Sequence, residues 1–333
     1  MIELHVHLAG SLKAATIIEY AKERNVPLPT YNASELERYL EAPNHCENKS
    51  KFYELCEMTD WVLQERRSIR RAMTELVKEL DAQGVMYAEI RFSPSECTLG
   101  GLRQDEAVAA AIEGLERGMQ ESRQIKANLV LCIIERMNEH EAFETVVAAK
   151  KYLHQGVGGL DLLLNESLYE TEIFDWLFDL IKEEHIPFTV HCGQYNTDSM
   201  KKAIRFGASR ISQGLHIQDD EELMNAIREK RVIVECCPAS NLKLGSVEDY
   251  ESHPIRKLFD LGIPVCVCTD RLRVSGITLE KEYRNLMDSQ GFTPHEIYQM
   301  NINAIHGAFL TQMEKDNLLF KLYEANKEIL NRE

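Results

Sequence analysis

Short apolar runs alternate with longer segments of helical periodicity along most of the chain. Segments such as Gln104–Gln124 and Glu172–Glu184 place apolar residues at helical spacing. Strand and helix in alternation predict right-handed crossovers and a parallel sheet, and near-continuous apolar runs are typical of strands buried on both faces. Eight such units predict a single-domain (β/α)8 barrel over residues 1–333. The predicted strands are Ile2–His7, Val85–Phe92, Ala127–Glu135, Gly159–Leu164, Phe188–Cys192, Arg210–Gly214, Val232–Cys237 and Val265–Asp270.

The interval between the first two predicted strands, about residues 8–84, is long for a barrel connection. It contains helical stretches at Lys51–Glu65 and Ser68–Gln83. A helical insertion after the first strand is expected to lie over the carboxyl-terminal mouth of the barrel, where a lid belongs. The charged segment 313–333 is expected to form a helix that packs on the outside.

Composition narrows the class of protein. The chain has 333 residues, of which 44% are hydrophobic and 28% charged, and this is typical of a globular protein with a sizeable core. Its net charge of -16 argues against nucleic acid or an anionic membrane as the main partner, which leaves small molecules. No run of 18 apolar residues occurs and the first strand begins at Ile2, so we expect neither a membrane span nor a signal peptide. The nine scattered cysteines are expected to be buried free thiols of a cytoplasmic protein, and nothing indicates an oligomeric state.

Polar residues that suit a metal ion stand at the ends of three predicted strands. His5 and His7 are alternate residues of the first strand, so their side chains point to the same face. His191 lies at the end of the fifth strand and Asp270 at the end of the eighth. The carboxyl ends of barrel strands meet at one face, so these four side chains predict a mononuclear site with room for a water. A bound metal would lower the pKa of that water and supply a nucleophile.

Around these residues the chain resembles the adenosine deaminase family of the amidohydrolase superfamily, over nearly its whole length. The matching motifs occur in the family's order. They are Ile2–Leu12, Tyr87–Pro94, His191–Gly193, Glu235–Asn241, Thr269–Asp270 with Val274–Ser275, and Asn301–Ala304. The resemblance implies a (β/α)8 barrel and one zinc ion held by His5, His7, His191 and Asp270.

Two proton-transfer groups of the family are replaced. A Glu that donates a proton to purine N1 follows the family's His-Ala-Gly motif, and here that position is Gln194. The family's sixth strand carries a His that helps to activate or orient the water, and here the residue is Gln213. A carboxamide donates a hydrogen bond but does not shuttle a proton at neutral pH. We therefore do not expect efficient deamination of adenosine by the family mechanism.

Substrate-binding positions differ as well. The family has Asp where this chain has Ala9, which would face the ribose, and Gly where it has Leu164, which would approach the purine. An Asp or Asn that holds purine N7 is replaced by Arg271, whose guanidinium matches a carboxylate or phosphate. The substrate or ligand is therefore expected to be a small molecule that is nucleoside-like or anionic.

Two functions remain open. The first is a zinc-dependent hydrolase of altered specificity or weak deaminase activity, in which Asp270 or His216 takes over proton transfer. The second is a catalytically inactive pseudoenzyme that binds a ligand or regulates. Retained metal ligands favour the first. The replacement of the family's acid and base by Gln194 and Gln213, together with the loss of its ring-binding groups, favours the second. Glu89 and Glu166 are expected to be structural rather than catalytic.

Overall fold

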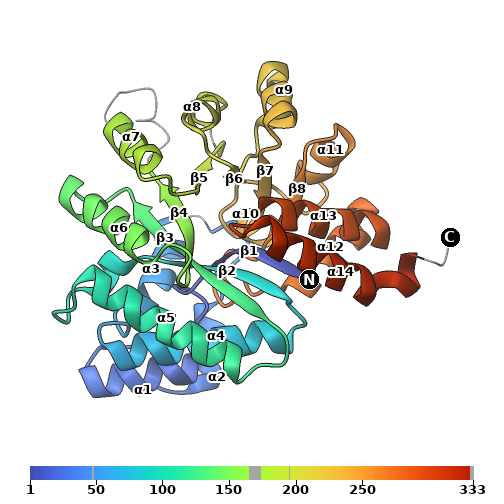
Figure 1. Ribbon diagram of the computed structural model, residues 1–333. Coiled ribbons are helices and arrows are strands. Elements are labelled where there is room, and N and C mark those ends of the chain that lie inside the picture. The colour runs from blue at the N-terminus through green and yellow to red at the C-terminus, as the bar shows by residue number, and fades with distance from the viewer. Residues whose placement is uncertain (47–48, 165–173, 195, 331–333) are drawn as a thin grey trace.

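The computed structural model describes residues 1–46, 49–164, 174–194 and 196–330. Eight parallel strands follow one another around a central barrel in the order β1 to β8, and helices surround them (Figure 1). This confirms the predicted (β/α)8 barrel. The strands are β1 (Ile2–His7), β2 (Tyr87–Phe92), β3 (Lys126–Ile134), β4 (Val157–Leu163), β5 (Phe188–Cys192), β6 (Arg210–Gln213), β7 (Ile233–Cys236) and β8 (Val265–Val267).

The barrel closes between its last and first strands through the backbone of a predicted metal ligand. The His7 N–H donates to the Asp270 carbonyl at 2.7 Å, and the Asp270 N–H donates to the His5 carbonyl at 2.8 Å. We predicted that the eighth strand continues to Asp270, but regular strand geometry ends at Val267. Asp270 has a φ of 61°, in the left-handed region, which interrupts a strand while its backbone still pairs with β1.

Helices fill the intervals between the strands largely as the periodicity predicts. The predicted helix at 104–124 ends four residues early, at Gln120, and the one at 172–184 is described from Asp175 to Glu183. The helices are α1 (Ala14–Arg24), α2 (Ala33–Leu40), α3 (Lys49–Asp60), α4 (Arg66–Ala82), α5 (Gln104–Gln120), α6 (Glu139–Tyr152), α7 (Asp175–Glu183), α8 (Asp198–Phe206), α9 (Glu221–Lys230), α10 (Pro238–Lys243), α11 (Ile255–Asp260), α12 (Leu279–Gln290), α13 (Pro294–Gly307) and α14 (Gln312–Leu330).

Four helices, α1 to α4, lie between β1 and β2. The connection between α2 and α3 runs beside the loops that follow β7 and β8, because the Ala42 N–H donates to the Val274 carbonyl (3.0 Å) and the Cys46 N–H to the Lys243 carbonyl (2.8 Å). The end of α3 meets the loop after β1, where the Gly10 N–H donates to Thr59 Oγ1 at 3.1 Å. This part of the segment therefore lies at the carboxyl-terminal end of the barrel. Its role as a lid stays a prediction.

Close helix packing and apolar burial hold the outer layer together. Helices α4 and α5 approach closely at Gly114, where an added Cβ would lie 2.3 Å from the Arg70 carbonyl oxygen. The tail helix α14 packs on α13 through Leu318 and Leu322, as predicted for a segment on the outside. All nine cysteines are buried and none forms a disulfide, which confirms the prediction of buried free thiols.

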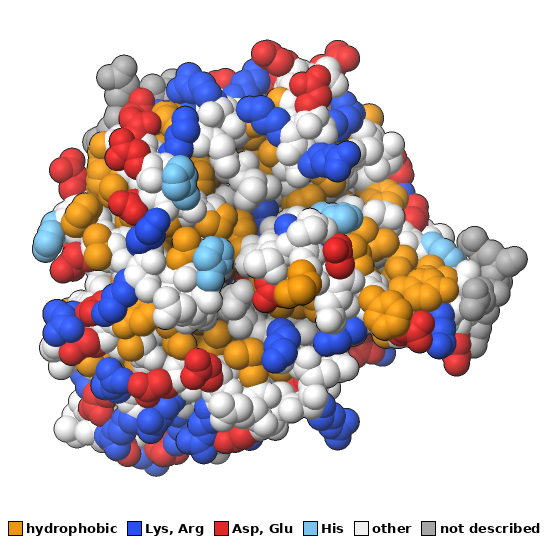
Figure 2. Space-filling model, in the orientation of Figure 1, with side chains coloured by type: hydrophobic (Ala, Val, Ile, Leu, Met, Phe, Trp, Pro, Cys, Tyr) orange, Lys and Arg blue, Asp and Glu red, His pale blue; other side chains and the backbone are white. Residues whose placement is uncertain are grey.

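The surface carries charges of both signs. Acidic and basic side chains intermingle over the face shown in Figure 2. Ion pairs such as Arg71–Glu19 (2.6 Å) and Lys78–Glu121 (2.7 Å) join neighbouring helices. Exposed pairs contribute about 0–1 kcal/mol each, so apolar packing rather than these pairs holds the helices in place. None of the helices described is long and apolar enough to cross a membrane.

Candidate metal centre

Three imidazoles predicted as metal ligands converge at the carboxyl end of the barrel. The Nε2 atom of His5 lies 3.2 Å from His7 Nε2 and 3.1 Å from His191 Nε2. These side chains form the group of possible metal ligands among the described residues, with all ligand atoms within 4.8 Å of one another. His5 and His7 are buried, as is every residue of β1. The alternation of β1 and the position of His191 at the end of β5 thus bring the three rings together.

The fourth predicted ligand, Asp270, faces the same point. Its Oδ1 lies 3.6 Å from both His5 Nε2 and His7 Nε2. Its other oxygen, Oδ2, accepts a hydrogen bond from Ser240 Oγ at 2.5 Å. Burial opposes ionisation of Asp270, but the neighbouring Arg271 and the two imidazoles hold its pKa well below the ordinary value. The carboxylate is therefore ionised and oriented toward the imidazoles.

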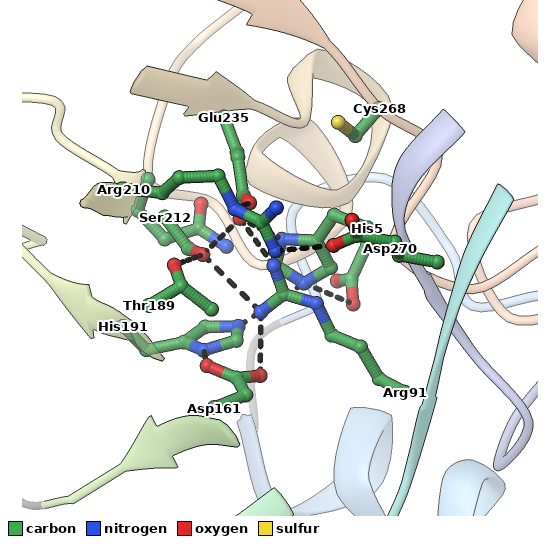
Figure 3. A network of polar contacts seen from close by, with 12 residues as sticks. His5, Arg91, Asp161, Thr189, His191, Arg210, Ser212, Glu235, Cys268 and Asp270 are labelled. Atoms are coloured by element: carbon green, nitrogen blue, oxygen red, sulfur yellow. Dashed lines mark hydrogen bonds and ion pairs between the residues drawn. The ribbon is translucent and has the colours of Figure 1, made fainter. Parts of the chain in front are cut away.

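Two buried carboxylates orient the imidazoles from behind. Glu235 Oε2 lies 3.1 Å from His5 Nδ1, and Asp161 Oδ1 lies 3.0 Å from His191 Nδ1. The Arg91 guanidinium spans both acids, donating to Asp161 Oδ2 at 2.5 Å and to Glu235 (Figure 3). Burial raises the pKa of each carboxyl, but Arg91 together with the neighbouring imidazoles, and with Arg210 at Glu235, lowers both pKa values below the ordinary range. With anionic acceptors at Nδ1, neutral His5 and His191 carry their protons there and turn the Nε2 lone pairs inward.

This arrangement fits a zinc ion. Lone pairs that face each other across 3.1 Å repel unless a proton or a cation lies between them. Imidazole nitrogens bind zinc at about 2.0–2.1 Å, and tetrahedral ligands at that distance lie roughly 3.3 Å apart, close to the separations seen here. Three nitrogens and one carboxylate oxygen are also a donor set that zinc accepts. The residues present are therefore competent to hold the metal that the sequence predicts.

Arg271 occupies a built slot beside this cluster. Its Nη1 donates to Asp270 Oδ1 at 2.5 Å, and its guanidinium lies 5.7 Å from the centre of the Phe52 ring on α3. Gly10 makes room for it, since a Cβ at that position would lie 2.9 Å from Arg271 Cδ. Arg271 is 9% exposed, and its Nε is buried with no hydrogen-bond partner among the described residues. The slot therefore holds a fixed positive charge, and the Nε–H group of Arg271 is still able to donate a hydrogen bond.

Gln213 ends β6 next to the strand that carries His191. Its φ is 81°, and a side chain other than glycine in the left-handed region is unusual. Such conformations persist where the surroundings enforce them, and they gather at functional sites. Here the side chain is anchored, because Asn241 Nδ2 donates to Gln213 Oε1 at 2.5 Å.

The remaining predicted catalytic groups lie at different depths. Gln194, two residues after Cys192 of β5, donates through Nε2 to Ser246 Oγ at 2.9 Å. His216 stands just before a 3₁₀ helix, η4 (Ile217–Asp219), and its Nδ1 lies 3.1 Å from Asp219 Oδ2. Its side chain is 41% exposed, so the ring faces solvent rather than the buried imidazoles. A catalytic role for His216 stays a prediction that this placement does not favour.

The predicted substrate-binding positions lie at the ends of their strands. Ala9 is half-buried in the loop after β1, and Leu164 is 8% exposed immediately after β4. Glu166 lies outside the described residues. Glu89 is enclosed in the barrel, where its Oε2 pairs with Arg210 Nη2 at 2.6 Å, in agreement with the expected structural role.

Several residues of the site were not singled out from the sequence. Asp161 is the single charge in the apolar run 159–164, and a lone acid in a strand buried on both faces needs a buried partner. This feature indicates that Asp161 has a buried partner, but it does not indicate that the partner is His191. The local sequence pattern does not predict the contact of Ser240 with Asp270 or the contact between Asn241 and His253.

Comparison with known proteins decides the family. The family model for adenosine deaminase matches residues 1–325. The chain belongs to the adenosine deaminase family. It is 34% identical to an adenosine deaminase of Haemophilus ducreyi, over 99% of this chain and 97% of the relative.

Solved structures of the adenosine deaminase fold superimpose on the whole chain. An adenine deaminase from Arthrobacter aurescens has a TM-score of 0.87 at 23% identity and covers 98% of each chain. An Arabidopsis ADAL protein complexed with GMP has a TM-score of 0.85 at 25% identity, over 97% of this chain and 96% of the other. Adenosine deaminase family membership and the barrel fold are thus supported by both sequence and structure.

Proposed function

We propose that this protein is a zinc-dependent hydrolase built on the adenosine deaminase scaffold, with altered specificity or weak deaminase activity. One zinc ion would be held by His5, His7, His191 and Asp270. When bound, such an ion lowers the pKa of a coordinated water and supplies a nucleophile. The observation that carries the proposal is the convergence of three imidazoles, with His5 Nε2 3.2 Å from His7 Nε2 and 3.1 Å from His191 Nε2, and with carboxylates fixing two of the rings.

The chain's own residues argue against efficient adenosine turnover. Gln194 and Gln213 stand where the family uses a proton donor and an imidazole, and neither carboxamide titrates near neutral pH. A positioned acid or base contributes about 10²- to 10⁴-fold, so losing two would cost on the order of 10⁴- to 10⁸-fold if their effects were independent. Asp270, whose Oδ1 lies 3.6 Å from His5 Nε2 and His7 Nε2, is then the candidate for the proton acceptor.

The substrate that suits these residues is small and nucleoside-like or anionic. Arg271 presents a cation whose Nε has no partner among the described groups. A guanidinium matches a carboxylate or a phosphate through paired hydrogen bonds. An Arabidopsis relative was solved with a nucleotide, GMP, which is consistent with a phosphate-bearing ligand for this chain.

One observation favours the second function, an inactive ligand-binding protein. Arg271 Nη1 lies 2.5 Å from the Asp270 oxygen that faces the imidazoles, so the guanidinium competes with a metal ion for that oxygen. A cation supplied by the chain would let the fold stay intact without zinc. Metal content therefore separates the two functions.

The test is a paired assay on one preparation. Bound zinc is measured first, and conversion of adenosine to inosine is then followed for the native protein and for a Gln194→Glu, Gln213→His double variant. The proposal expects about one zinc per chain, little conversion by the native protein and a clear gain by the double variant. Absence of zinc from protein purified without chelators would support the inactive protein. Rapid conversion by the native protein would show that the reading of Gln194 and Gln213 is wrong.

A further inference from the structure

The side chain of Gln213 is held from one side only. Its Oε1 accepts from Asn241, while its Nε2 has no hydrogen-bond partner in the described part of the chain. The residue is 7% exposed at the end of β6, beside the strand that carries His191. Which of its two terminal atoms faces the site decides whether Gln213 donates to a ligand or accepts from it.

A chain of hydrogen bonds answers that question, and it starts from a backbone donor. The Ile255 N–H donates to His253 Nδ1 at 3.2 Å, so Nδ1 must be the acceptor nitrogen of that ring. The proton of a neutral His253 then lies on Nε2, which is 3.0 Å from Asn241 Oδ1. The Asn241 atom that meets this proton must be its oxygen, which leaves Nδ2 to donate to Gln213 Oε1. The Gln213 nitrogen is therefore the atom that remains for the site.

The first link of this chain, His253, is enclosed and uncharged. The ring is 2% exposed, and burial lowers its pKa to about 3. A neutral imidazole has one donor and one acceptor, and here the backbone of α11 has assigned the acceptor. Asn241 is fully buried as well, so water does not exchange with either contact. Each hydrogen bond from Ile255 to Gln213 therefore has only one possible donor and one possible acceptor.

We propose that Gln213 is a specificity-determining residue that presents only N–H to the site, with Asn241 and His253 as positioning residues. A ligand must then offer a hydrogen-bond acceptor at that point, such as the oxygen of a 6-oxo purine nucleoside, rather than an exocyclic amine. This inference rests on the proposed function for the identity of the site as a nucleoside-like pocket. The polarity of Gln213 itself follows from the hydrogen bonds alone.

The hydrogen-bond chain is tested without any ligand. Long-range ¹H–¹⁵N correlation spectra of protein labelled with ¹⁵N-histidine show which ring nitrogen carries the proton, and a His253→Phe variant identifies the signal among eleven histidines. The proton is expected on Nε2 across neutral pH. A proton on Nδ1, or a cationic ring, would overturn the inference even if the protein proves to be an active zinc hydrolase.

Ligand preference tests the consequence. Binding of inosine and of adenosine, which differ at C6 in carrying oxygen or an amino group, is measured by calorimetry on the holoprotein, with chromatography to confirm that adenosine is unchanged. The native protein is expected to prefer inosine on the order of 10-fold or more, because adenosine would bring a donor against a donor. A preference for adenosine, or no binding of either nucleoside, would overturn the assignment of this ligand class.

One substitution reverses the polarity without touching the ligand-facing residue. In Asn241→Asp, both carboxylate oxygens accept, so Gln213 must turn its nitrogen toward residue 241 and its oxygen toward the site. The preference for inosine is expected to fall about 10-fold or to invert. Asn225→Asp, an exposed position whose Oδ1 accepts from Arg228, is the matched control and should keep the native ratio.

A second variant keeps the test decisive if Asn241→Asp does not fold. Gln213→Glu still accepts from Asn241 and presents a carboxylate oxygen to the site, so it too should lose the preference for inosine. Gln155→Glu, at an exposed position, controls for the added charge. Thermal unfolding checks that each variant is folded. A native ratio in a folded Gln213→Glu protein would refute the proposed role, whether or not the protein hydrolyses anything.

Discussion

Replacing Arg271 with Met should strengthen zinc binding. Its Nη1 lies 2.5 Å from Asp270 Oδ1, which puts the guanidinium within about 4.5 Å of an ion held by that oxygen. A guanidinium of charge +1 and a zinc ion of charge +2 at about 4.5 Å repel by roughly 7 kcal/mol at an effective dielectric constant near 20. Because solvent and relaxation reduce this value, a gain in zinc affinity of about 10- to 10³-fold is expected. Met keeps much of the side-chain volume in the slot that Gly10 leaves open.

The assay is a competition titration with a chromophoric chelator at constant pH and salt. Arg271→Lys retains a positive charge and should show a smaller gain, while Arg273→Met removes a nearby arginine that pairs with Glu79 at 2.6 Å and should leave zinc affinity unchanged. Unaltered or weaker zinc binding by a folded Arg271→Met protein would refute the reasoning. The guanidinium would then be a support for Asp270 rather than a competitor of the metal.

Three further predictions concern the site and the fold. Asp161→Asn should lower zinc affinity by about 10- to 100-fold in the same titration, because His191 loses the carboxylate that fixes its ring. Gly114→Ala should reduce the free energy of unfolding in urea by about 1–3 kcal/mol, since the new methyl would lie 2.3 Å from the Arg70 carbonyl oxygen; a native stability would contradict it. Burial raises the pKa of Glu282 from 4.5 to about 8, so the folded state holds this proton more tightly than the unfolded state. Stability from this group is complete below pH 4.5 and is lost as pH rises toward 8, and Glu282→Gln should flatten that decline in urea unfolding measured between pH 5 and 8.

The barrel was predictable from the sequence because short apolar runs alternate with helical segments. The run 129–134 in β3 is apolar throughout, and runs of this kind produce the hydrophobic signal from which strands were assigned. The end of β8 was not predictable, because the left-handed φ of Asp270 depends on its pairing with β1. Hydrophobic periodicity carries no information about such a turn.

The convergence of the candidate metal ligands was also predictable, while their surroundings were not. A His-x-His pair at a strand end needs only the alternation of strand side chains to be interpreted. The contact of Arg271 with Asp270 depends on a slot formed by Gly10 and Phe52, which lie far away in the sequence. The link from His253 to Gln213 likewise joins separate loops, and no local pattern marks it.

The backbone contacts that close the barrel also determine when the candidate metal centre is able to exist. His5 and His7 are made early, yet the His7 N–H and the His5 C=O bond to Asp270, which follows only after all eight strands have been made. Contacts so distant along the chain form late, because a long loop must be closed before they stabilise anything. A nascent or truncated chain that stops before residue 270 therefore has histidines but no complete centre. Metal capture would thus report that the chain has been made past Asp270 and that the barrel has closed.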